Sequence, residues 1–301
     1  MLFLARYVMQ GPKEAFITVA SLSVLTLWLA PVGFLLGAAI ALVTLRVGIK
    51  EGAQVLGVAA LVQLLLAWAT TQNIWLAVVG VVEFMLPAWV LASVLRTTGS
   101  LATMIQLVIW LVGTLVIGFH LVVDDPIGWW QQLFTTLFAP AMEQADMHVP
   151  ESTWAQVAQL ATSMLAMSMV ILWVSMVLFA RWWQSLLYAP GRFQQDFHRL
   201  SLPRQLAWLT GIVALAGLLI GPQQHGLISD LFAVLSAGLM FHGLAVIHAL
   251  VERRQMSTNW LIATYVLLLL FPQMILLLAL IALFDIWMDL RQRYAPPINE
   301  E

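Results

Sequence analysis

Cysteine is absent from the 301 residues, which excludes disulfides, thiolate nucleophiles and thiolate metal ligands. Charge is scarce as well: only 9% of the residues are charged, against about 25% in a soluble domain. The net charge of −2 gives no reason to expect nucleic-acid binding. The composition is therefore not that of a soluble domain.

The motifs of soluble nucleotide-binding and hydrolytic enzymes are also missing. The sequence contains no G-x-x-x-x-G-K-[ST], H-E-x-x-H or G-x-S-x-G, and no Rossmann glycine pattern after a strand. Any transport driven by ATP would therefore need an ATPase module from another chain. We expect no enzymatic activity, no cofactor and no metal site.

Long apolar runs are abundant. Hydrophobic residues make up 62% of the chain, and runs of 18 or more, long enough to cross a bilayer as a helix, recur throughout. We predict an all-α fold, a polytopic transmembrane helical bundle forming a single domain over residues 1–301. Five spans are clear and a sixth is short: 53–70, 74–95, 101–123, 154–180, 227–250 and, as the short one, 206–221.

The two ends of the chain are ambiguous. Pro31 interrupts the apolar segment 13–50, and Pro272 interrupts the segment 259–290. A proline removes one helix hydrogen bond and bends the chain, so each segment is either one long kinked helix or two short spans.

The placement of basic residues favours two spans at each end. The connections after residues 70, 123 and 221 contain no lysine or arginine, and with two terminal hairpins all 13 basic residues lie on one side. By the positive-inside rule, we predict about ten membrane segments in the bacterial inner membrane, with both termini cytoplasmic and eight segments as the fallback. Arg6 and Lys13 precede no small-residue cleavage site, so we expect the first segment to be retained.

Two connections have helical patterns. In 127–147, aromatic and aliphatic residues recur at helical spacing on the face opposite Gln and Thr residues. This pattern predicts an amphipathic helix on the outer face. It would be an interfacial anchor or, alternatively, a lid over an outward-facing cavity. In the cytoplasmic loop 181–204, Phe193, Phe197 and Leu200 share one helical face, which we expect to rest on lipid headgroups, with docking of a partner as the alternative.

Glu83 is the clearest candidate for chemistry, because it lies in the middle of an apolar span. A carboxylate there costs about 2.5–3.5 kcal/mol unless it is protonated or paired. Pro87, one turn later, frees the backbone carbonyl of Glu83. The pair could bind a cationic or hydroxyl-bearing ligand or carry a proton; the alternative is a structural hydrogen bond to Gln63 or Gln106.

The histidines at membrane depth are weaker candidates. His242 and His248 are six residues apart, about 240° around a helix, so a shared metal site is not expected. We predict that His242, beside Gly243, is a hydrogen-bonding residue in helix packing rather than a proton carrier. His120 is spaced to pair with Asp124 at the outer end of its span.

Several segments resemble a known family. Gly33, Gly37 and Ala41 form a ladder of small residues that lets helices approach closely. The stretch APVGFLLGAAIALVTLRVGIKEGAQVLGVAAL, which contains this ladder, resembles the YybS-like family of bacterial membrane proteins. FQQDFHRLSLPRQLAW and FHGLAVIHALVERR are similar to other segments of that family, so the resemblance covers nearly the whole chain.

The resemblance implies a helical bundle without an assigned activity. The early helices of the family are in turn similar to the substrate-binding components of energy-coupling-factor transporters, which contain no ATPase domain. Those components carry an Ala-x-x-x-Ala coupling patch in the first helix, whereas here Ala20-Ser-Leu-Ser-Val24 ends in valine.

We therefore predict an integral membrane protein that binds or transports a small molecule. Its ligand-binding candidates are Glu83, Gln106, His120 and His242, in a cavity among their spans. Its partners would be the lipid bilayer and, for a transporter, an energising ATPase module. The alternative is a non-transporting scaffold or assembly factor that acts through the cytoplasmic loop. An intramembrane enzyme is third, because no nucleophile–base pair is evident.

Overall fold

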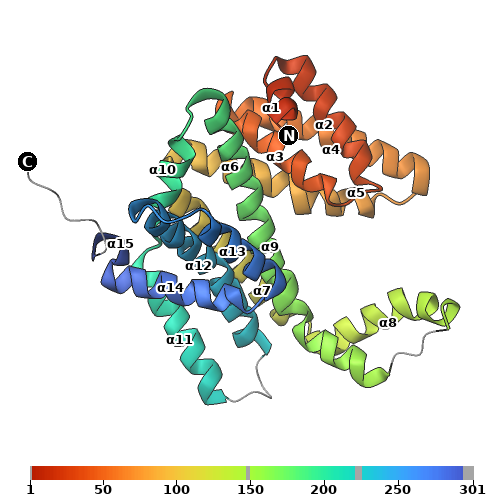
Figure 1. Ribbon diagram of the computed structural model, residues 1–301. Helices are drawn as coiled ribbons and strands as arrows, with labels where there is room; N and C mark the ends of the chain where they lie inside the picture. Colours follow the sequence, from red (N-terminus) through yellow and green to blue (C-terminus); the bar gives the residue numbers. More distant parts are fainter. Residues whose placement is uncertain (1, 147–149, 221–225, 294–301) are drawn as a thin grey trace, which may run out of the picture. The chain divides into compact units, whose positions relative to one another are not determined.

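A computed structural model of the chain describes residues 2–146, 150–220 and 226–293 (Figure 1). Within these ranges all regular secondary structure is helical, as predicted. Five helices are long and apolar enough to cross a membrane, and four shorter ones are also apolar. The helices are α1 (Leu2–Val8), α2 (Pro12–Thr26), α3 (Val32–Arg46), α4 (Ile49–Thr71), α5 (Trp75–Gly80), the π-helix η1 (Val81–Met85), α6 (Leu86–Thr98), α7 (Leu101–Val122), α8 (Pro126–Gln144), α9 (Glu151–Tyr188), α10 (Arg192–His198), α11 (Arg204–Ile220), α12 (Gly226–Arg253), α13 (Asn259–Leu270), α14 (Met274–Met288) and α15 (Leu290–Arg293).

The helices group into two compact units. Unit 1 comprises residues 1–108 and 171–200, and unit 2 comprises residues 109–170 and 201–301. The single domain over 1–301 stays a prediction.

Both ambiguous terminal segments form pairs of helices. The first breaks between α2 and α3, where residues 27–31 form a turn that includes Pro31. The second breaks at Phe271, whose backbone is extended (φ −128°, ψ 95°) immediately before Pro272. This agrees with the restriction that a proline places on the residue before it. The structure thus favours the two-helix alternative at both ends.

In unit 1, α3 is the central helix: every residue from Leu36 to Leu45 is buried. The small-residue ladder explains this position. A Cβ atom added to Gly33 would lie 2.6 Å from the ring of Phe84, and one added to Gly37 would lie 2.8 Å from the Phe84 carbonyl oxygen. Close packing of α3 against the π-helix η1 therefore depends on these glycines, as the ladder predicted.

In unit 2, α12 is the central helix: every residue from Val234 to Val246 is buried. Helix α14 lies directly against it. A Cβ atom at Gly243 would lie 2.0 Å from the carbonyl oxygen of Leu278, so only glycine allows this approach. The predicted close helix contact beside His242 is confirmed.

The predicted amphipathic helix of 127–147 is α8, Pro126–Gln144; residue 147 lies outside the described part of the chain. Its aromatic side chains contact the end of α7 and the start of α9. Phe119 and Trp129 have ring centroids 5.4 Å apart, and Phe138 stacks on Trp154. The Trp130 indole also donates a hydrogen bond of 2.8 Å to Thr162.

The structure corrects the expectation for the cytoplasmic loop 181–204. Helix α9 continues to Tyr188, and α10 follows after the turn at Pro190-Gly191. On α10 and just after it, Phe197 and Leu200 are only 6% and 2% exposed. Phe193, the third residue of this face, is partly exposed. Phe197 and Leu200 are packed within the protein and therefore do not rest on headgroups.

Candidate functional site

Glu83 lies in the π-helical turn Val81–Met85, between α5 and α6. The turn precedes Pro87, which has no amide hydrogen to continue the α-helical hydrogen bonding. A π-helical turn inside an α-helix is rare and frequently marks a functional site. Local sequence thus places an irregular backbone at the one acidic residue of this span.

The backbone carbonyl of Glu83, predicted to be freed by Pro87, accepts a hydrogen bond from a residue of another helix. Trp173 of α9 donates a hydrogen bond of 2.8 Å from its indole nitrogen to this oxygen. The indole is buried, 4% exposed. The freed carbonyl is therefore used to attach α9 to the irregular turn.

The carboxylate of Glu83 is half-buried and has no hydrogen-bond or ion-pair partner among the described residues. Gln63 of α4 lies nearby: its amide nitrogen would be 2.4 Å from a Cβ at Gly80, three residues before Glu83. Gln63 is only 2% exposed, and its Oε1 accepts no hydrogen bond. Two oxygen acceptors without donors thus belong to one region of unit 1.

Gln106 does not join this group. Its Nε2 donates to the carbonyl of Ala102, one turn earlier in α7. The structure thus gives Gln106 a contact within its own helix.

In unit 2, His120 pairs with Asp230 of α12 and not with Asp124. The His120 Nε2 and Asp230 Oδ2 atoms are 2.8 Å apart, and the other carboxylate oxygen accepts a hydrogen bond from Ser163 of α9. Asp230 is 3% exposed. The serine contacts the carboxylate and not the imidazole, so the order of contacts in a Ser-His-Asp triad is not reproduced here.

His242 is fully buried and belongs to a second cluster in unit 2. Its Nε2 lies 2.9 Å from Asp285 Oδ2, which also accepts a hydrogen bond of 2.7 Å from Arg291. The backbone amide of Leu202 donates to Nδ1 of the ring at 3.4 Å. Because Nδ1 accepts, we assign the proton of a neutral ring to Nε2, facing Asp285. This agrees with the predicted role of His242 as a hydrogen-bonding residue in helix packing.

The two histidine clusters are separate. Asp230 and His242 are twelve residues apart on α12, which is about 18 Å along a helix. Within the described residues no group of three His, Asp or Glu side chains is placed to hold a metal ion. Unit 2 therefore holds two buried histidine–aspartate contacts at two levels of one helix.

Sequence reasoning missed Asp230, Ser163 and Arg291. A signal existed for Asp230, which is an acidic residue within the predicted span 227–250. For Ser163 there was none, because its partner Asp230 is 67 residues away in the sequence. Arg291 is only six residues from its partner Asp285, so a local signal existed for this pair as well.

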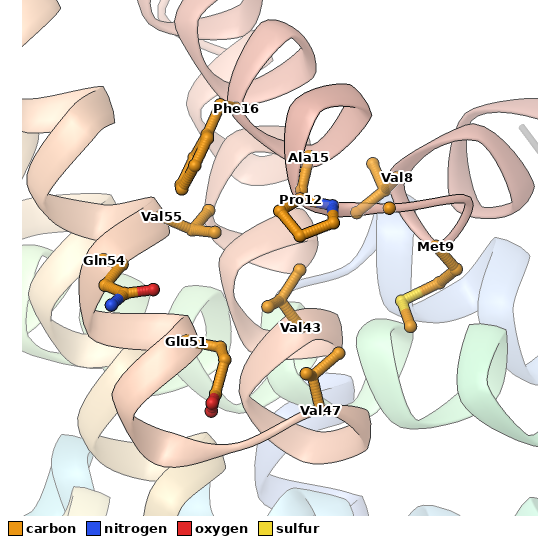
Figure 2. Close-up of a pocket in the computed structure, with 11 residues that line it drawn as sticks. Val8, Met9, Pro12, Ala15, Phe16, Val43, Val47, Glu51, Gln54 and Val55 are labelled. Atoms are coloured by element: carbon orange, nitrogen blue, oxygen red, sulfur yellow. The ribbon is translucent and has the colours of Figure 1, made fainter.

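Unit 1 contains a pocket of about 230 Å³ between α1, α2, α3 and α4 (Figure 2). Its walls are mostly apolar, and the polar side chains are those of Glu51 and Gln54, both exposed and both from α4. None of Glu83, Gln106, His120 and His242 lines it. The lining residues are Val8, Met9, Gly11, Pro12, Ala15, Phe16, Val43, Val47, Glu51, Gln54 and Val55.

Comparison with known proteins gives one match. A family model described as "Predicted membrane protein (DUF2232)" matches residues 16–286, which is most of the chain. No curated protein and no solved structure matches. The resemblances to the YybS-like family and to energy-coupling-factor components stay predictions.

Proposed function

Since this chain belongs to the DUF2232 family of predicted membrane proteins, we propose that it binds a small molecule in the bacterial inner membrane, with both termini cytoplasmic. The apolar helices imply contact with the lipid bilayer. Binding is the function that the geometry of unit 1 supports best.

The pocket between α1 and α4 carries the proposal. Binding sites for small molecules are concave and mostly apolar, with a few polar groups that fix orientation. This pocket has such a lining, because Val8, Ala15, Val43 and Val55 belong to the buried core of unit 1. Its volume of about 230 Å³ is below the roughly 300–1,000 Å³ usual for drug-sized ligands. The ligand is therefore small.

The two polar side chains of the pocket indicate the chemistry of the ligand. Glu51 is the third residue of α4, and its Oε2 folds back over Gly48 at the start of the helix. A carboxylate there interacts favourably with the helix dipole and repels an anion. In Figure 2, Gln54 lies one turn further along the same helix. The expected ligand is a largely apolar molecule with a neutral or cationic head that donates hydrogen bonds.

Transport is the extension of this proposal. The sequence contains no P-loop, so transport driven by ATP would require an ATPase from a partner chain. The alternative function is a scaffold acting through the cytoplasmic loop, whose docking surface would use exposed loop residues, because Phe197 and Leu200 are buried.

Purification in a mild detergent, followed by mass spectrometry of bound small molecules and proteins, tests the proposal. We expect a small molecule of the stated class to co-purify with the wild type. Val47→Trp, at a half-exposed position that lines the pocket, should fill it and remove the molecule. The matched control is Val79→Trp on α5, which is similarly exposed and does not line the pocket.

Equal retention of the molecule in Val47→Trp and Val79→Trp would show that the pocket is not the binding site. A wild type that carries a partner protein and no small molecule would instead support the scaffold.

A further inference from the structure

Two unpartnered oxygen atoms lie at the π-helical turn of unit 1. One belongs to the carboxyl group of Glu83, and the other is Oε1 of Gln63, which is buried and accepts no hydrogen bond. Gln63 contacts the backbone at Gly80, and residues three apart on a helix are neighbours on its surface. The side chain of Glu83 can therefore turn towards the amide of Gln63.

No charged side chain is positioned to compensate an ionised Glu83. The helices that contact η1 are α3, α4, α5 and α6, with Trp173 of α9. Apart from Glu83, the titratable residues of these segments within unit 1 all lie in the first or last two turns of their helices: Arg46, Lys50, Glu51, Arg96, Arg181 and Tyr188. Arg181, for example, follows Trp173 by eight residues, about 12 Å along a helix.

Protonation of Glu83 satisfies both oxygen atoms at once. A carboxylate at membrane depth without a partner is strongly disfavoured, and so is a buried amide oxygen without a donor. A protonated carboxyl group has one O–H donor, and Gln63 Oε1 can accept a hydrogen bond from it.

We propose that Glu83 is a proton-binding site in the membrane, whose protonated carboxyl group donates a hydrogen bond to Oε1 of Gln63. Release transfers this proton from the carboxyl oxygen to water and removes the hydrogen bond to Gln63 Oε1, and no charged side chain of the helices that contact η1 compensates the carboxylate that remains. The Trp173 hydrogen bond to the Glu83 carbonyl fixes the backbone on which this exchange occurs.

In a chain that transports the ligand of the pocket, this proton would be the coupling ion. That coupling rests on the proposed function, whereas the proton site does not. The two can fail separately, because the pocket variant Val47→Trp should leave the proton site unchanged.

Infrared difference spectroscopy of the purified protein, between mildly acidic and alkaline buffer, tests the proposal. We expect the wild type to show the carbonyl band of a protonated carboxyl group that disappears in alkaline buffer. Glu83→Gln should lack this band and keep the fold, since its amide can still donate to Gln63. The control Glu151→Gln, at an exposed position on α9, should keep the band.

Gln63→Met tests the hydrogen bond separately. Loss of the acceptor should shift the band to higher frequency without abolishing it. A band that persists in Glu83→Gln, or that is unchanged in Gln63→Met, would overturn the proposal.

Thermal unfolding gives a second, independent measurement. Because an ionised Glu83 at membrane depth has no charged partner in the folded chain, wild-type stability should fall as the pH rises through release of the proton. In Glu83→Gln this part of the pH dependence should vanish, and Glu151→Gln should retain it. Identical pH profiles for wild type and Glu83→Gln would also contradict the proton site.

Discussion

Removal of the carboxylate of Asp285 should destabilise unit 2 severely. Asp285 is 3% exposed and is the shared partner of His242 and Arg291. In Asp285→Ala the guanidinium of Arg291 loses this carboxylate, and the buried imidazole loses its acceptor. Both losses occur where α12 and α14 are in contact.

The magnitude follows from burial. Removing one partner of a buried ion pair costs about 3–5 kcal/mol, because the other charge is left desolvated. An exposed pair contributes only about 0–1 kcal/mol, since water solvates each charge when the other is removed. The structure places Asp285 in the first class, with its side chain 1% exposed and that of Arg291 11% exposed.

Asp196 on α10 is a matched control. It also pairs with two arginines, Arg181 at 2.7 Å and Arg192 at 3.1 Å, but the side chains of this cluster are 23–63% exposed. Asp196→Ala should therefore cost at most about 1 kcal/mol for each pair.

The assay is thermal unfolding in detergent, monitored through the near-ultraviolet circular dichroism signal of the 14 tryptophans. The decrease in stability for Asp285→Ala, about 3–5 kcal/mol, should exceed that for Asp196→Ala, at most about 2 kcal/mol for its two pairs together. The double variant Asp285→Ala, Arg291→Met should recover much of the loss, because no buried charge remains. Equal losses for the two single aspartate variants would refute this reasoning from burial.

Three further predictions concern topology and packing. Cysteine introduced at Gln144 should react with an impermeant reagent added from outside and at Asn299 only from inside; the reverse labelling would overturn the orientation. Gly243→Ala should lower the unfolding temperature, because its Cβ would overlap a backbone carbonyl of α14. The control Gly118→Ala, whose Cβ would have no atom within 4 Å, should raise the free energy of unfolding by roughly 0.5–1 kcal/mol. Equal effects of the two variants would contradict the close contact. Trp173→Phe should cost about 1–3 kcal/mol, because the irregular turn of η1 loses its indole donor; unchanged unfolding would show that water replaces this donor.

The sequence predicted those features that depend on one helix and its neighbours in the chain. Pro31 and Pro272 located the breaks in the terminal segments, because a missing amide hydrogen disrupts a helix wherever it occurs. Gly243 located the closest helix contact for a similar reason, since a missing Cβ is a local property. Pro87 marked the backbone carbonyl of Glu83, which is freed from α-helical hydrogen bonding.

Pairing between distant helices was not predictable in the same way. His120 was expected to meet Asp124 because they lie one turn apart, yet its partner Asp230 is 110 residues further along the chain. The apolar face of α10 was likewise assigned to headgroups, because lipid-facing and protein-facing surfaces are both apolar. Burial of Phe197 could be seen only once the surrounding helices were placed.

The short helix pair at the C-terminal end has a consequence for the surrounding membrane. Helices α13 and α14 have 12 and 15 residues, about 18 and 22 Å at 1.5 Å per residue, against a hydrocarbon core of about 30 Å. With Arg253 and Arg291 at the inner surface, as the predicted orientation requires, the turn at Pro272 ends well short of the outer headgroups. Helix α13 has no buried residue, so the bilayer itself must adapt to it. Lipids of the outer leaflet would descend towards the turn, and the membrane would be thin beside α13. Each Å of mismatch costs a fraction of a kcal/mol, so short-chain lipids would gather there.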